Sequence, residues 1–182
     1  GSDTTCGDDA GNLKITVVEW VDTLYGPSVP QLKPGSKDER GLNNDSTGRL
    51  LCPSEHNWDD EIVHVKICDS DPEFTVTAGP WPMCMYAAQT RDPDDMEKGL
   101  FPSALLIKSF NNIITSPSSA VSVSVLNDLV NSENILPASK KAKRKGPTHS
   151  NIASLIGLKS VTPRTITYTA VQLRFALSNA NS

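Results

Sequence analysis

Apolar side chains recur at spacings of three and four residues in two stretches of the chain. The first stretch follows Pro102, and its apolar positions are Leu105, Leu106, Ile107, Phe110, Ile113 and Ile114. Proline suits the first turn of a helix, because the N–H that it lacks has no partner there. This spacing, together with the stop at Pro117, predicts a helix over residues 102–115.

The second stretch lies near the end of the sequence. Thr162 is a good N-cap and Pro163 fits a first turn, so we expect a helix over residues 162–178. One stripe of this helix contains Ile166, Ala170, Leu173 and Leu177, and the opposite stripe contains Arg164, Tyr168, Val171 and Phe175. A helix that is apolar on two sides is buried between layers or shows one side to a partner. Tyr168, Val171 and Phe175 are therefore a candidate interaction surface.

Weaker patterns complete the prediction of a mainly α fold, an irregular helical domain with long loops and a small β element near the N-terminal half. Asn57 is expected to cap a helix that turns Ile62, Val63 and Ile67 toward the core. Residues 13–24 fit a strand or a short helix equally well. The remaining segments are a surface loop at 26–48, a short apolar element at 83–88, weaker helices at 121–130 and 151–156, and a linker at 131–146.

The expected organisation is one domain overall. Residues 1–12 are interpreted as a disordered leader that begins with a Gly-Ser remnant of an expression tag. Residues 13–136 are expected to form an acidic helical body, and residues 137–149 a basic linker. Residues 150–182 are expected to form a C-terminal helical pair that packs on the body.

Charge is distributed unevenly along the chain, which has 17 basic and 21 acidic residues. Residues 140–182 contain no acidic residue and eight basic ones, namely Lys140, Lys141, Lys143, Arg144, Lys145, Lys159, Arg164 and Arg174. Such asymmetry indicates either an anionic partner or a basic tail that docks on the acidic body. We take these eight residues as candidate nucleic-acid-binding residues.

Residues 140–145 have the composition of a nuclear localisation signal or a nucleic-acid patch, although a solvated linker would look the same. The main hypothesis is a nuclear, non-enzymatic module associated with nucleic acid or chromatin. The alternative is a protein-interaction or oligomerisation domain without nucleic-acid contact. Residues 151–178 loosely resemble a helix-turn-helix, but the turn is long and Pro163 falls at an apolar position, so two core helices are favoured.

Cys52, His56, His64 and Cys68 form a C-x3-H…H-x3-C pattern, and zinc accepts two sulfurs and two imidazoles. A zinc-dependent protein is thus a third hypothesis, although buried cysteines and surface histidines are favoured, and no metal or cofactor is expected. The four cysteines are expected to be free thiols. No nucleophile elbow or phosphate-binding loop is present, which leans against an enzyme. No membrane partner is expected, because no apolar run approaches about 18 residues.

Five stretches carry a resemblance to a known family: residues 47–53 (TGRLLCP), 58–60 (WDD), 92–101 (DPDDMEKGLF), 114–120 (ITSPSSA) and 157–178. Through them the chain resembles an uncharacterised domain family of mushroom-forming fungi that is often found near mobile elements. The resemblance implies a domain of unknown function, and it implies no catalytic residues.

Overall fold

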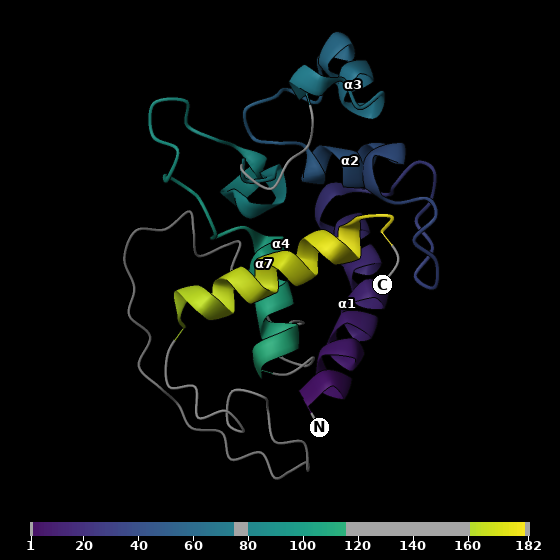
Figure 1. Ribbon diagram of the computed structural model, residues 1–182, viewed down its shortest axis with the longest axis vertical. Coiled ribbons are helices and arrows are strands. Elements are labelled where there is room, and N and C mark those ends of the chain that lie inside the picture. Colours follow the sequence, from purple (N-terminus) through teal and green to yellow (C-terminus); the bar gives the residue numbers. More distant parts are fainter. Residues whose placement is uncertain (1, 75–79, 116–160, 181–182) are drawn as a thin grey trace.

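The computed structural model describes residues 2–74, 80–115 and 161–180 (Figure 1). The protein is mainly α, as predicted. In chain order, its elements are α1 (Ser2–Tyr25), η1 (Gly41–Asn43), α2 (Asp45–Leu51), α3 (Glu61–Cys68), η2 (Pro72–Phe74), η3 (Met83–Met85), η4 (Ala87–Gln89), α4 (Ala104–Phe110), η5 (Asn111–Thr115) and α7 (Pro163–Leu177). The η elements are short 3-10 turns, except η5, which is a π-helical turn.

The expected small β element does not form a strand. In the described residues, β pairing is limited to two isolated bridges, which join Pro53 to Pro82 and Tyr86 to Leu100. The apolar segment predicted at residues 83–88 forms the two turns η3 and η4. The helices predicted at 121–130 and 151–156 lie outside the described residues.

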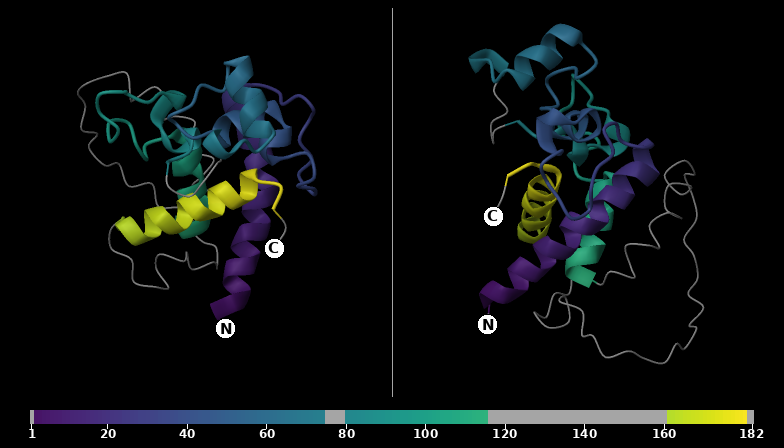
Figure 2. Two further views of the ribbon diagram at one scale, coloured as in Figure 1. Left: turned by 45° about the horizontal axis from the view of Figure 1, so that its top comes forward. Right: turned by 90° about the vertical axis from the view of Figure 1, so that its right-hand side faces the viewer.

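The main core of the described residues centres on three helices, and α2 adds Leu50 and Leu51 to it. The helix α7 runs across α1 and α4, which also contact each other (Figures 1 and 2). Burying a large aliphatic side chain contributes about 1.5 to 3 kcal/mol, so this junction supplies much of the stability. Its buried members include Leu13, Val17, Val21, Leu50, Leu105, Ile113, Leu173 and Leu177.

The helix α1 corrects two predictions, because it is continuous from Ser2 to Tyr25. The disordered leader expected at residues 1–12 is thus part of a helix from Ser2 onward, and residues 13–24 are helical rather than extended. Leu13, Val17 and Val21 follow one another at spacings of four and are fully buried, which explains the helical choice. Gly26, with φ of 90°, follows the helix in the left-handed conformation that favours glycine.

The helix α2 was not predicted, because the Pro, Gly, Asn and charged residues of 26–48 indicated a loop. The loop ends earlier, because Asn44 caps α2: its side-chain oxygen accepts hydrogen bonds from the backbone N–H groups of Ser46 (3.0 Å) and Thr47 (3.4 Å). Leu50 and Leu51 are buried in the main core. Tertiary packing therefore stabilises a helix that is too short to form alone.

The helix α3 begins later than predicted. Asp60, rather than Asn57, is its N-cap, with bonds of 2.9 Å from the Ile62 N–H and 3.3 Å from the Val63 N–H. Ile67 is buried as expected, and Val63 packs beside it. Ile62 was predicted to face the core, and this is wrong, because its side chain is 70% exposed.

Both strongly patterned helices are confirmed. Ser103 caps α4, and the helical turn continues as η5 to Thr115, so the predicted span of 102–115 is nearly complete. Thr162 caps α7 in a reciprocal capping box with Thr165, and Pro163 occupies the first helical position. The predicted inner stripe of α7 is buried at Ala170, Leu173 and Leu177, and Ile166 packs against the same core.

The segment before α2 holds the C-terminal end of α7. Arg40 is buried, and its guanidinium donates to the Ala176 carbonyl (2.6 Å) and the Lys14 carbonyl (2.8 Å), joining α7 to α1. Lys37 Nζ donates to the Ala180 carbonyl (2.5 Å) and lies 3.4 Å from the centre of the Phe175 ring. Cations at a helix C-terminus stabilise its unpaired carbonyls.

Candidate functional site

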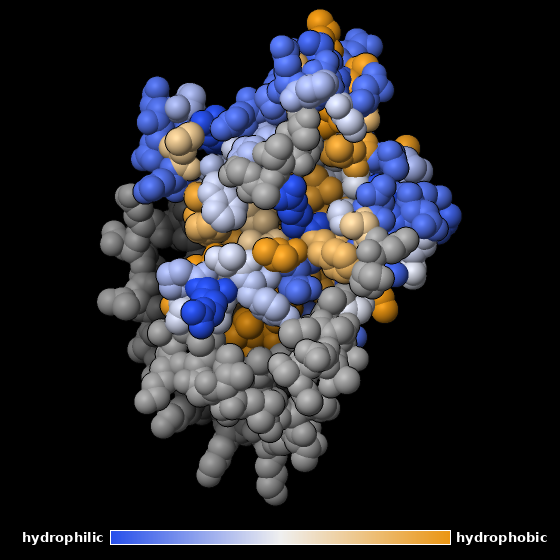
Figure 3. Space-filling model, viewed as in Figure 1, coloured by the Kyte–Doolittle hydropathy of each residue, from blue (hydrophilic) through white to orange (hydrophobic). Residues whose placement is uncertain are grey.

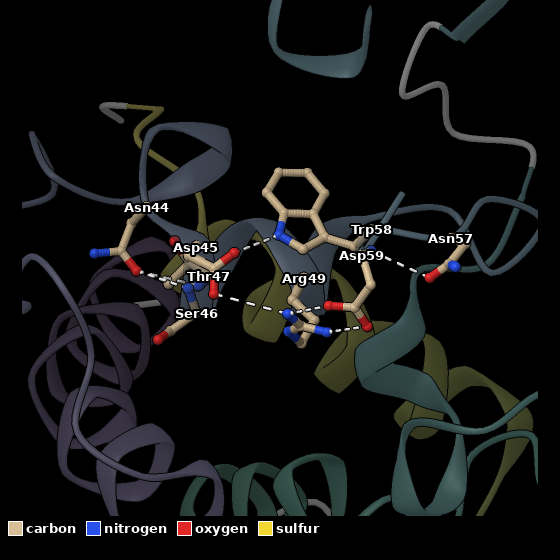
Figure 4. A network of polar contacts seen from close by, with 8 residues as sticks. All are labelled: Asn44, Asp45, Ser46, Thr47, Arg49, Asn57, Trp58 and Asp59. Atoms are coloured by element: carbon tan, nitrogen blue, oxygen red, sulfur yellow. Dashed lines mark hydrogen bonds and ion pairs between the residues drawn. The ribbon is translucent and has the colours of Figure 1, made fainter. Parts of the chain in front are cut away.

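Two sequence motifs meet in one polar network between α2 and the start of α3 (Figure 4). Arg49 of α2 forms a bidentate pair with Asp59, with both N–O distances at 2.7 Å. Asp45 accepts a hydrogen bond of 2.7 Å from the indole N–H of Trp58. The motifs at residues 47–53 and 58–60 thus form a single joint, which we call the α2–α3 joint.

A glycine permits the close approach at this joint. A Cβ on Gly48 would lie 2.4 Å from the Trp58 ring, a distance at which the ring would have to move. Trp58 is 4% exposed and is tied to Asp45, so it has little room to move. Gly48 therefore lets the indole lie flat against the α2 backbone.

The cation of the joint, Arg49, is paired with carboxylates inside the joint. The hydrogen bonds from Arg49 lower the pKa of Asp59, and the same bonds raise the pKa of Arg49. Asp45 lies 3.8 Å from the same guanidinium and adds a second negative charge. Because the guanidinium is already neutralised by carboxylates, Arg49 is poorly suited to bind a phosphate.

Two hollows lie on either side of Arg49 and Gln89. One, of about 530 Å³, is mostly polar and is lined in part by Tyr25, Asp45 and Ser46. The other, of about 310 Å³, is lined in part by Cys52, His56, Asn57, Trp58 and Met83. Neither lining brings a nucleophile together with a hydrogen-bonded base, so the hollows offer no arrangement for acyl or phosphoryl transfer.

The wall between these hollows has a strained backbone. Ala88 and Gln89 are consecutive left-handed residues with φ of 51° and 52°, and each costs roughly 1 to 2 kcal/mol relative to a glycine. A hydrogen bond of 2.8 Å from the Ala87 N–H to the Gly99 carbonyl helps to hold this turn. Gln89 of this turn and Arg49 both contribute to the lining of the two hollows.

The candidate nucleic-acid-binding residues are only partly described. Arg164 is exposed in the first turn of α7. Arg174 is half-buried in the last turn and interacts with other groups, so it is not a free surface cation. Ten residues of helix separate the two by about 15 Å. Lys140, Lys141, Lys143, Arg144, Lys145 and Lys159 lie outside the described residues.

The candidate interaction stripe on α7 is largely covered. Tyr168 packs against the main core, and Phe175 lies beneath the Lys37 ammonium. Val171 stays open, with 58% of its surface exposed. Tyr168 and Phe175 are thus half-buried while Val171 is exposed, and the interaction role of these three residues stays a prediction.

The four candidate zinc ligands have other partners. The Cys52 thiol faces the carbonyls of Pro53 and His56, and burial raises its pKa to about 11. The His56 ring packs on Phe74, with 5.0 Å between ring centres.

The other two candidate ligands are also engaged. His64 packs on Trp58, with ring centres 4.0 Å apart, and Cys68 points to the Leu42 carbonyl. Within the described residues, no three potential metal-binding side chains form a group. The described structure therefore does not bring Cys52, His56, His64 and Cys68 together into such a group.

An apolar groove between α4 and α7 was not predicted. It has a volume of about 290 Å³, and its lining includes Phe101, Ile107, Phe110, Val161 and Ile166. Ile107 and Phe110 are two of the apolar positions from which the helix over residues 102–115 was predicted. Both are only half-buried, because they face this groove.

These features define a mainly helical domain in which polar side chains such as Arg40, Arg49 and Asp45 join separate elements. No helix in the described ranges has the length and apolar character to span a bilayer. The whole chain, residues 1–182, matches the Family of unknown function (DUF6698), and the protein belongs to this family. Neither the curated proteins nor the solved structures contain a significant match.

Proposed function

We propose that the protein is a non-enzymatic nuclear module that associates with nucleic acid or chromatin through its basic C-terminal segment. The observation that carries the proposal is the charge distribution. Residues 140–182 hold eight basic and no acidic residues, whereas all 21 acidic residues and the other nine basic residues precede them. A dense run of cations binds phosphates by releasing counterions, without reading base sequence.

The described part of this segment supports a footprint near the start of α7. Arg164 is exposed there, and the N-terminal end of a helix carries partial positive charge. Arg174, which interacts within the fold, contributes less. The proposed footprint therefore consists of Lys140, Lys141, Lys143, Arg144, Lys145, Lys159 and Arg164.

The test is fluorescence anisotropy with labelled duplex DNA, single-stranded DNA and RNA over a range of salt concentrations. We expect binding that weakens steeply with salt. In a plot of the logarithm of the binding constant against the logarithm of the salt concentration, the slope for duplex DNA should become about 0.9 less steep for each phosphate contact that is removed. Replacement of Lys140, Lys141, Lys143, Arg144 and Lys145 by Ala should abolish most of the binding. The same variant, fused to a fluorescent protein, should lose nuclear accumulation.

A control variant removes three cations from the body instead, by Lys33→Ala, Arg91→Ala and Lys98→Ala. This control should retain nucleic-acid binding, because these residues lie among acidic side chains, and Lys33 and Lys98 already pair with Glu39 and Asp92. Equal losses in both variants would show that the binding depends on overall charge. Unchanged binding without the five cations of residues 140–145 would refute the proposal.

Self-association is a second candidate function, and the open apolar surface at α7 favours it. Val161 and Val171 are more than half exposed, and Val161 lines the apolar groove between α4 and α7. A second copy of the chain would bury both. Light scattering at increasing concentration should then show a dimer that Val171→Ser weakens, whereas a strictly monomeric protein would dismiss this candidate.

A further inference from the structure

The helix α3 stands apart from the main core. It lies at one end of the molecule in Figure 1 and in the right-hand view of Figure 2, and its lobe, residues 53–74, forms a small hydrophobic cluster in which Trp58 and Ile67 pack with Cys52 at the end of α2. We call residues 53–74 the α3 lobe. The inner side of α3 packs on this small core, so its outer side faces solvent.

The outer side of α3 carries an unpartnered apolar pair. Ile62 is 70% exposed and Val65 is 53% exposed, and their spacing of three residues places them side by side on the helix. Figure 3 shows hydrophobic residues among hydrophilic ones at this end of the molecule. Lys66 lies beside the pair, but its ammonium is directed over the Phe74 ring at 4.8 Å.

Acidic side chains surround this pair. The α3 lobe contains seven acidic residues and one basic residue. Asp59 is neutralised by Arg49 from α2. By contrast, Glu61 and Asp69, which share the outer side with Ile62 and Val65, are exposed and form no ion pair with another described residue.

We propose that the outer face of α3 docks a lysine- and arginine-rich segment of a partner protein that also carries aliphatic side chains. The aliphatic side chains would cover Ile62 and Val65, while the cations pair with Glu61 and Asp69. Charge complementarity selects this class of partner. Nucleic acids and anionic lipid surfaces are repelled by the lobe, and a second copy of the same face would bring like charges together.

The test uses a fluorescein-labelled amphipathic peptide of lysine and leucine as the probe, with the full-length protein. We expect binding that weakens with salt, and we expect the backbone amide NMR signals of Glu61–Cys68 to shift. Two double variants test the two parts of this face. One combines Glu61→Lys with Asp69→Lys, and the other combines Ile62→Ser with Val65→Ser. Each should lower the affinity for the peptide by about tenfold or more. All four positions are exposed, so these variants should remain folded.

Matched controls make the same changes elsewhere. The pair Asp94→Lys with Glu97→Lys reverses two exposed charges in the turn before α4, and Ile15→Ser with Val29→Ser removes two exposed aliphatic side chains, one from α1 and one from the loop that follows it. Both controls should keep the affinity within about twofold of the wild type. Equal losses in the controls would mean that the peptide binds the acidic body without using α3, which would overturn the proposal.

Three further outcomes would also overturn it. The first is an absence of peptide binding at low salt. The second is self-association of the protein that disappears in the Ile62→Ser, Val65→Ser variant, because a second copy would then cover the face. The third is binding that emerges only after Lys140, Lys141, Lys143, Arg144 and Lys145 become Ala, because the chain's own basic segment would then be the occupant.

Discussion

Gly48 shows how one missing side chain shapes the α2–α3 joint. We predict that Gly48→Ala lowers the free energy of unfolding, because the added methyl group would lie 2.4 Å from the Trp58 ring. Overpacking costs about 1 to 3 kcal/mol, which exceeds or offsets the gain in helix propensity of about 1 kcal/mol. Urea unfolding measures the change. Gly35→Ala is the control, since a methyl group there meets nothing, and an equal or smaller loss in Gly48→Ala would contradict the account.

Lys37 makes the stability of the protein depend on pH. Burial, followed by the nearby charges of Arg40 and Lys14, lowers its pKa from 10.5 to about 8. Between these two values the unfolded chain keeps a proton that the folded chain has released. Lys37 therefore makes the free energy of unfolding increase as the pH rises through this window.

The contribution of Lys37 is isolated by comparing the wild type with Lys37→Met. The effects of the other titrating groups cancel when the free energies of unfolding of the two proteins are subtracted. We expect the wild type to gain stability relative to the variant as pH rises from about 8 to about 10, as measured by urea unfolding at each pH. A difference that stays flat or falls over this range would show that Lys37 is not desolvated beside Phe175 and Ala180.

At the scale of elements, prediction from sequence succeeded where two signals agreed. For α7, the cap at Thr162, the proline after it and the stripe ending at Leu177 all indicate the same helix, and the structure confirms it. For α4, the apolar spacing and the turn near Pro102 also agree. A start signal and an apolar period that support each other define a helix even without tertiary information.

The elements that were missed lacked one of these signals. The helix α1 is rich in β-branched residues such as Val17, Val18 and Val21, which favour strands, so the apolar spacing of four was not decisive. The helix α2 is seven residues long and contains Gly48, and its stability comes from the Asn44 cap and from Leu50 and Leu51 in the main core. Those contacts involve distant parts of the chain.

The candidate surfaces show the same limit. The apolar stripe on α7 was correctly read as two-sided, but the covering of Phe175 by Lys37 joins residues far apart in sequence. The exposed pair on α3 was missed because Ile62 was assigned to the core. Ile62 and Ile67 are five residues apart and therefore lie about 140° apart around the helix, so they cannot both face the same small core.

At the scale of the whole molecule, the described residues form two hydrophobic clusters of unequal size. The main core joins α1, α2, α4 and α7, whereas the α3 lobe depends on Cys52, Trp58 and Ile67. The two are linked by the packing of Gly48 on Trp58 and by the Arg49–Asp59 pair, which is largely exposed. Exposed ion pairs contribute about 0 to 1 kcal/mol, so the lobe should open more easily than the main core.

This difference in stability leads to a prediction about where each core substitution acts. Ile67→Ala removes buried contacts inside the α3 lobe, so we expect faster hydrogen exchange in Glu61–Cys68 while the amides of α1, α4 and α7 keep their protection. Leu173→Ala opens a cavity where α7 meets α1 and α4, at a cost of about 2 to 5 kcal/mol. Because Leu173 is fully buried in the main core, the loss of protection should then extend through all three helices. A uniform loss in both variants would instead show one cooperative unit, in which the face of α3 opens only when the whole molecule unfolds.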